Sequence, residues 1–120
     1  RLDEVVAAYA LLVKARDELR KDCHIVTHTY DYAVPDGRPA KAVLGLVSVG
    51  PWIQPHLNAA GLTDPAGQQL FVNALIDRLA VRLSALAQTV ERFHVVDTRG
   101  TLPKDRKHWN DEIHPTGTGY

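Results

Sequence analysis

The residues best suited to chemistry lie near the end of the chain, where a histidine follows an aspartate by three positions. Asp111 and His114 are separated by Glu112 and Ile113, and Pro115 follows the histidine directly. Within a turn, this spacing lets the carboxylate of Asp111 accept a hydrogen bond from the Nδ1–H of the imidazole. That bond would fix the tautomer and leave Nε2 of His114 to take a proton from a nucleophile. The pair therefore predicts general base catalysis, although the same residues could instead pin a surface turn.

Four regular elements are predicted to position this pair. Apolar residues recur at three- and four-residue spacing over residues 2–19 and 65–90, which predicts two amphipathic helices. Short β-branched segments at 23–29 and 93–98 predict two strands. Because each helix leads directly into a strand, we expect an α/β domain with a parallel sheet covered on both faces.

The second helix has the clearest start. Asp64 can cap it, and Pro65 suits the first helical position because its missing N–H costs nothing there. The apolar stripe expected to face the core comprises Leu70, Ala74, Leu75, Leu79, Leu83, Leu86 and Val90.

Residues 30–64 are predicted to form a long loop with at most short helical or extended pieces, because proline and glycine interrupt them repeatedly. A loop this long often carries function. Tyr30, Asp31 and Tyr32 follow a predicted strand end, where ligands of α/β sheets bind, so they are candidates for a substrate pocket. Trp52 is a candidate for a pocket wall or lid. The alternatives are a core edge for the three residues and an ordinary turn around Trp52.

Composition restricts the possible classes of protein. The chain has 120 residues, 45% of them hydrophobic, and 14 basic side chains balance 14 acidic ones. One α/β segment over residues 1–120 is expected, without the positive charge of a nucleic-acid binder or an apolar run long enough to span a membrane. The single Cys23 excludes an internal disulfide and a multi-cysteine zinc site, and we expect it to be a buried hydrophobe.

The remaining polar residues receive plain structural interpretations. His24 and His28 fall four apart on a predicted strand, about 13 Å from each other, so no metal site is expected. Glu112 is expected to point to solvent and Trp109 to pack. The charged run 104–108 is expected to be a solvated loop.

The last block of the chain resembles the final conserved block of the SGNH/GDSL hydrolases, a family of α/β esterases and lipases. The residues that carry the resemblance are Trp109, Asp111-x-x-His114-Pro115 and Thr116-Gly117-x-Gly119-Tyr120. The strand predicted at 93–98 and the order of elements are also similar to the C-terminal half of that family.

This resemblance implies a three-layer α/β/α, flavodoxin-like fold with a parallel sheet, of which the chain is the C-terminal half. It implies a serine ester hydrolase without a cofactor, in which His114 is the general base and Asp111 orients it. The substrate would be a small-molecule, carbohydrate or lipid ester. The alternative is a non-catalytic α/β binding or interaction domain in which Asp111 and His114 are structural.

The other blocks of the family do not occur in the sequence. It contains no Gly-Asp-Ser nucleophile block and no Gly-x-Asn-Asp oxyanion block, and its only Asn-Asp pair is Asn110-Asp111. The chain also contains no methionine and begins at Arg1. We therefore expect a segment of a longer protein, inactive without an N-terminal half that carries the nucleophile. The sequence predicts no cellular compartment.

Overall fold

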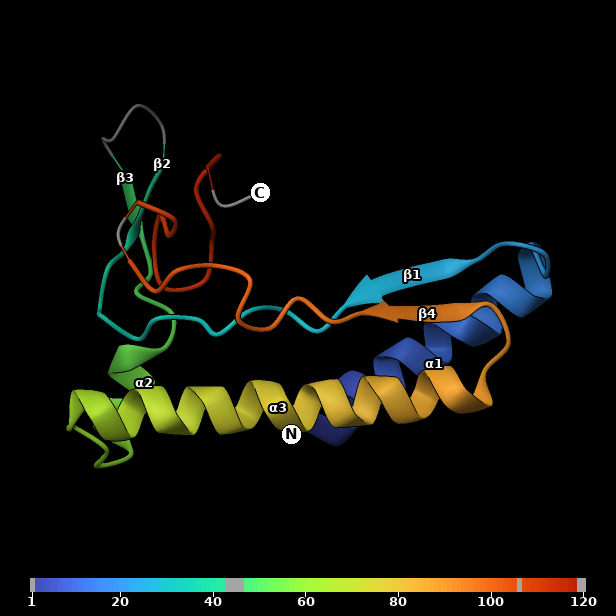
Figure 1. Ribbon diagram of the computed structural model, residues 1–120, viewed down its shortest axis with the longest axis horizontal. Coiled ribbons are helices and arrows are strands. Elements are labelled where there is room, and N and C mark those ends of the chain that lie inside the picture. Colours follow the sequence, from blue (N-terminus) through green and yellow to red (C-terminus); the bar gives the residue numbers. More distant parts are fainter. Residues whose placement is uncertain (1, 43–46, 106, 119–120) are drawn as a thin grey trace. The chain divides into compact units, whose positions relative to one another are not determined.

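The part of the chain that the structure describes combines three helices with four short strands. The computed structural model describes residues 2–42, 47–105 and 107–118 (Figure 1). Its elements are α1 (Leu2–Leu19), β1 (Ile25–His28), β2 (Ala40–Ala42), β3 (Val47–Val49), α2 (Gln54–Ala59), α3 (Pro65–Thr89) and β4 (Phe93–Val96). They form two compact units. The first comprises Arg1–Tyr30 with Ile76–Arg99, and the second comprises Asp31–Leu75 with Gly100–Tyr120.

The first unit is built on a parallel pair of strands. β1 and β4 lie side by side, with Ile25 opposite Phe93 and His28 opposite Val96 (Figure 1). Both strands and a parallel sheet were predicted from the sequence and are confirmed, whereas the pairing of these two strands with each other was not predicted. The chain therefore has mixed helices and strands with a small parallel sheet, as the α/β class requires.

Helix α1 packs on one face of this sheet. The ring of Tyr9 meets Phe93 edge-on at 5.7 Å between ring centroids, and its hydroxyl hydrogen-bonds to Thr27 Oγ1 at 2.8 Å. Arg16 donates to the backbone carbonyls of Cys23 and Glu91 at 3.2 and 3.1 Å. These contacts fix α1 against the beginning of both strands.

The other face of the sheet differs from the prediction. Val26 and Val96 point away from α1 and are exposed, as is Cys23 before the strand. The predicted cover on both faces is therefore not present among the described residues, and the prediction of a buried Cys23 was wrong. The β-branched composition indicated the strands correctly, but composition alone could not show which face is covered.

Helix α3 begins as predicted, and Leu83 of the predicted core stripe is buried, but other residues of that stripe are exposed. Asp64 Oδ2 accepts a hydrogen bond from the Gly67 N–H at 2.7 Å, which confirms the cap. The side chains buried on α3 are Gln68, Val72, Ala80 and Leu83. Leu70, Ala74 and Leu75 were predicted in the core stripe but are exposed. Apolar residues occur on most sides of this helix, so periodicity alone could not identify its buried side.

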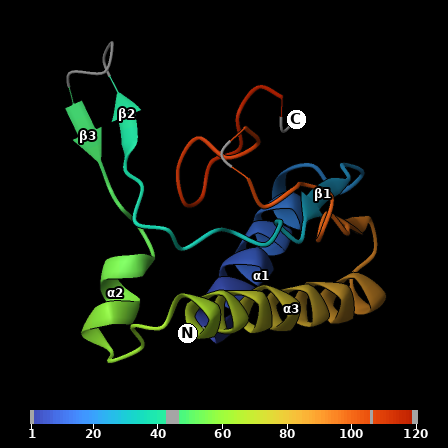
Figure 2. The same ribbon diagram turned by 60° about the vertical axis from the view of Figure 1, so that its left-hand side comes forward.

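The second unit holds the long loop and the last block. Residues 40–42 and 47–49 pair antiparallel as β2 and β3 (Figure 2). The short helix α2 follows, and the segment from Gly100 contains no helix or named strand within the described residues. The prediction of a long loop with short regular pieces is confirmed. No helix in the described part of the chain is long and apolar enough to cross a bilayer.

Candidate functional site

A closed loop in the second unit presents the Asp111–His114 pair. Trp109 and Pro115 form an isolated antiparallel bridge. Inside it, the Asn110 N–H donates to the His114 carbonyl oxygen at 2.8 Å. Residues 111–113 thus form the tip of a loop whose two ends are hydrogen-bonded to each other.

The base of this loop is anchored by Trp109. Its side chain is buried, and its indole Nε1–H donates to the Pro103 carbonyl at 3.1 Å. Its own carbonyl accepts a hydrogen bond from Arg38 Nη1 at 2.9 Å, while Arg38 is paired with Asp36. The expectation that Trp109 packs rather than faces solvent is confirmed. Arg106, Gly119 and Tyr120 lie outside the described residues.

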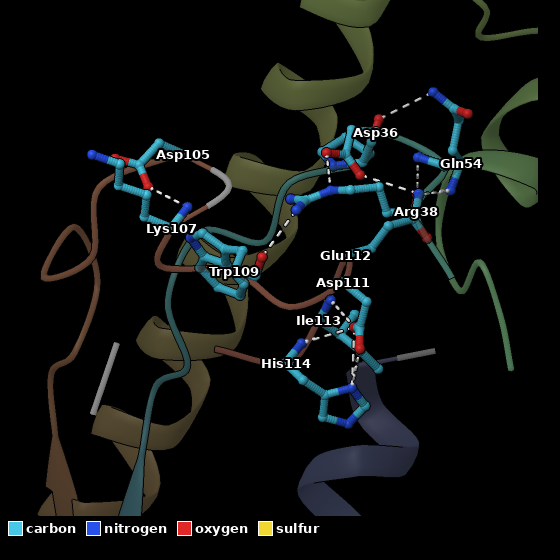
Figure 3. A network of polar contacts seen from close by, with 12 residues as sticks. Asp36, Arg38, Gln54, Asp105, Lys107, Trp109, Asp111, Glu112, Ile113 and His114 are labelled. Carbon is cyan, nitrogen blue, oxygen red and sulfur yellow. Dashed lines mark hydrogen bonds and ion pairs between the residues drawn. The ribbon is translucent and has the colours of Figure 1, made fainter. Parts of the chain in front are cut away.

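The expected hydrogen bond between Asp111 and His114 is present. His114 Nδ1 lies 2.9 Å from Asp111 Oδ2 and 3.0 Å from Oδ1 (Figure 3). Because an ionised carboxylate can only accept, Nδ1 carries the proton. Oδ1 also accepts the backbone N–H groups of Ile113 and His114 at 2.9 and 3.0 Å. The aspartate therefore fixes both the backbone of the turn and the orientation of the ring.

The electrostatics of the pair keep Asp111 ionised. Its side chain is fully buried, and this burial alone would raise its pKa. The hydrogen bonds from Ile113 and His114 outweigh burial, so the pKa of Asp111 lies below its ordinary value. The ionised carboxylate therefore accepts the hydrogen bond from His114 Nδ1 and holds the imidazole in one orientation.

The imidazole itself is accessible. The side chain of His114 is 55% exposed, whereas that of Asp111 is 0% exposed. Among the residues that the structure describes, none bonds to Nε2 of His114. The chain has two serines, Ser48 in β3 and Ser84 in α3. Within the part of the chain that the structure describes, the ring is thus held through Nδ1, and its side chain remains partly exposed.

Trp52 lies beside this ring. The two ring centroids are 6.4 Å apart and the ring planes are nearly perpendicular, at 82°. Trp52 remains partly exposed, at 38%. Its indole packs against Gly50, where a Cβ atom would lie 3.0 Å from Trp52 Nε1. Trp52, one of the four residues predicted to contact substrate, thus lies in ring contact with His114.

Asp31 and Tyr32 occupy another part of the second unit. The Asp31 carboxylate accepts backbone hydrogen bonds from Gly100 and Leu102, both at 2.7 Å, and one from the Thr101 hydroxyl at 3.0 Å. Burial opposes ionisation here too, but the hydrogen bonds hold the pKa of Asp31 below its ordinary value. The ammonium nitrogen Nζ of Lys104 lies over the Tyr32 ring, 5.1 Å from the ring centroid, in a cation–π contact. Asp31 thus ties two loop segments together, and a substrate-binding role for either residue stays a prediction.

Tyr30 belongs to the first unit, at the end of β1. Its backbone has φ of 69°, which is uncommon for an aromatic residue, and its N–H donates to His28 Nδ1 at 3.1 Å. Its ring stacks on that of His28, with centroids 5.8 Å apart. Its predicted contact with substrate likewise stays a prediction.

Glu112 is the site residue that sequence reasoning missed. It was expected to point to solvent, but it is fully buried, and that expectation was wrong. Its carboxylate projects away from the His114 ring and toward Gln54 (Figure 3). It accepts four backbone hydrogen bonds, from Gly37, Trp52, Ile53 and Gln54. The donors lie about 60 and 75 positions away along the chain, so no local sequence pattern could have indicated them.

A second Asp-x-x-His pair lies in the same segment. Asp105 Oδ1 is 2.7 Å from His108 Nδ1 and also accepts the backbone N–H groups of Lys107 and His108. The local geometry matches that of Asp111 and His114, but the Asp105 side chain is 50% exposed. Its hydrogen bond from His108 lowers the pKa of Asp105. The charged run 104–108 was predicted to be a solvated loop, and the repeated Asp-x-x-His spacing within it was not recognised from the sequence.

The described residues contain no cluster of three or more histidine, cysteine, aspartate or glutamate side chains that could hold a metal ion. His24 and His28 do not meet, since each has a different partner. His24 Nδ1 lies 2.7 Å from His94 Nε2 on the neighbouring strand, and His28 Nδ1 lies 3.3 Å from Thr98 Oγ1.

Comparisons with known proteins give no match. No protein-family model matches the chain, and no curated protein or solved structure is significantly similar to it. The likeness to SGNH/GDSL hydrolases therefore depends on the residues of the last block and on the order of the elements.

Proposed function

We propose that this chain supplies the aspartate–histidine part of a Ser-His-Asp triad in a serine ester hydrolase of SGNH type. The observation that carries the proposal is the state of His114: Nδ1 is held by a buried, ionised Asp111, while 55% of the histidine side chain is exposed. The resemblance of the surrounding block to the SGNH family supports the same assignment. The three-layer α/β/α fold belongs to this proposal, with the small parallel sheet as one part of it.

The proposed reaction has two halves, formation of an acyl-serine and its hydrolysis, and each half includes two proton transfers. A serine from outside the described residues attacks the ester carbonyl carbon, and His114 Nε2 takes the hydroxyl proton as the new C–O bond forms. The imidazolium, stabilised by Asp111, then gives that proton to the departing alkoxide. In the second half, His114 takes a proton from water, which attacks the acyl-serine, and returns it to the serine. Atoms balance as ester plus water giving acid plus alcohol.

The test uses the complete natural protein that contains this segment. Ester hydrolysis is measured with p-nitrophenyl acetate and butyrate. His114→Ala is expected to lower kcat by about 1,000-fold or more, because loss of a triad member removes proton transfer. Circular dichroism should show an unchanged fold, since His114 is exposed.

The matched control is His108→Ala. It removes the other Asp-x-x-His pair of the same loop and should leave kcat within about 2-fold of wild type. Full activity of the His114→Ala variant, or equal losses in the two variants, would contradict the proposal. That result would favour a binding domain in which Asp111 and His114 only stabilise a turn.

A further inference from the structure

The buried carboxylate of Glu112 connects three separate segments of the second unit. Its Oε1 accepts hydrogen bonds from the N–H groups of Gly37 and Gln54 at 2.9 and 3.0 Å. Its Oε2 accepts those of Trp52 and Ile53, both at 2.6 Å. A buried carboxylate without partners is strongly disfavoured. Here both oxygens are satisfied, so the carboxylate can hold these segments in place.

Three of the four donors belong to the start of helix α2. The first N–H groups of a helix have no acceptor inside the helix and need an external one. Ile53 occupies the N-cap position and makes no side-chain capping bond. Glu112, which lies far away in the sequence, therefore caps the start of α2 in place of a nearby side chain. Removing this carboxylate's charge would release the first turn of α2, its N-cap Ile53 and the preceding residue Trp52.

The position of Trp52 matters because its ring flanks His114. The centroid of the indole ring lies 6.4 Å from that of the His114 ring, and the indole also packs close to the backbone at Gly50. Gly50 has φ of 91°, which favours glycine, and it lets the indole pack this closely. With its backbone N–H fixed by Glu112, Trp52 presents a partly exposed aromatic surface next to the imidazole.

The neighbouring residues Asp111 and Glu112 bind different partners. Asp111 faces the imidazole, and Glu112 faces the segment that carries Trp52 (Figure 3). No hydrogen bond joins Glu112 to His114 within the described residues. We infer that Glu112 is a positioning residue that holds Trp52 as an apolar substrate wall beside His114. It thereby makes the site prefer esters with an acyl group larger than acetyl.

This inference rests on the proposed function, and its first test measures substrate preference. In the complete protein, Glu112→Gln and Trp52→Ala should each raise KM for p-nitrophenyl butyrate about 10-fold. Both should raise KM for p-nitrophenyl acetate less, because an acetyl group offers less apolar surface to the indole. The matched control is Asp105→Asn, which alters a carboxylate that also accepts backbone N–H groups of this loop. It should leave both KM values unchanged.

The second test is independent of activity. Nuclear Overhauser contacts between the Trp52 and His114 rings should be present in the wild-type protein and lost in Glu112→Gln. The His114 Nδ1–H signal should persist in that variant, since Asp111 is unaltered.

Each outcome decides a different point. Persistence of the ring contacts in Glu112→Gln would overturn the positioning role. If Trp52→Ala leaves the ratio of KM for p-nitrophenyl butyrate to KM for p-nitrophenyl acetate unchanged, Trp52 is not a substrate wall. This result decides the point even if Glu112→Gln fails to fold. A wild-type protein that hydrolyses no ester would overturn the proposed function and the substrate preference together, and the ring contacts would still decide the positioning of Trp52.

Discussion

Two aspartate–histidine pairs with the same spacing and the same local hydrogen bonds lie in one loop. Asp105 and Asp111 each accept the Nδ1–H of a histidine and two backbone N–H groups of the following turn. The pairs differ in burial, because Asp111 is enclosed and Asp105 is half exposed. Solvent screens an exposed ion pair, so the buried carboxylate acts more strongly on its imidazole. Burial, rather than spacing, distinguishes the candidate catalytic pair.

Because the pKa of Asp111 is lowered, the free energy of unfolding is expected to depend on pH in the acid range. Its pKa in the folded chain lies below the ordinary value of 3.8, so the charged form stabilises the fold. This stabilisation is fully present above pH 3.8 and is lost as the pH falls through the lower, folded-state pKa. Asp111→Asn should lower the free energy of unfolding by about 2 kcal/mol at pH 7, because it weakens hydrogen bonds to a charged group.

Urea denaturation of the wild type and of Asp111→Asn between pH 7 and pH 2 measures this effect. The difference between the two proteins should shrink at the acid end of the series. A difference that stays constant across the series would show that the Asp111 charge does not stabilise the fold.

At the scale of elements, helix α3 shows why burial cannot be read from periodicity alone. Leu83 is fully buried in the first unit, whereas Leu70 on the same helix is 69% exposed. Both were placed on one predicted stripe. The helix crosses the boundary between the two units, so different parts of it serve different cores.

This assignment predicts unequal effects of two identical substitutions. Leu83→Ala should lower the free energy of unfolding by about 3 kcal/mol, because it leaves a cavity in the core. Leu70→Ala should change it by less than about 0.5 kcal/mol, since that side chain is exposed. Thermal or urea denaturation followed by circular dichroism measures both. Equal destabilisation by the two variants would contradict the burial described for α3.

At the scale of the whole molecule, exposed apolar side chains and a net charge of zero both favour association between molecules. The chain carries a formal net charge of zero at pH 7. Several large apolar side chains are exposed, including Val26 and Val96 on the open face of the β1–β4 sheet. Charge repulsion that would keep molecules apart is therefore weakest near neutral pH.

We expect the 120-residue chain to self-associate more at pH 7 than at pH 9. Val26→Lys should reduce association at pH 7, because it places a charge on the open sheet face. Dynamic light scattering across concentration measures the mean particle size. If Val26→Lys associates as strongly as wild type, the open sheet face does not drive the contact.

The sequence by itself determined the elements α1, β1, α3 and β4 and the Asp111–His114 contact, whereas β2, β3 and α2 were not placed within the predicted long loop. Helix periodicity, the Asp64 cap and β-branched segments depend on local chemistry, so they could be predicted from neighbouring residues. The hydrogen bond from His114 to Asp111 spans three positions, and its geometry is likewise local. The likeness of the last block to a hydrolase family also came from sequence alone.

Only the tertiary structure decided what surrounds that pair. Glu112 is buried because its four donors come from residues far away in the chain, and Trp52 meets His114 across 62 positions of sequence. Which face of the sheet and which side of α3 are covered depends equally on distant partners. Local patterns specify how a segment folds, whereas burial depends on which other segments pack against it.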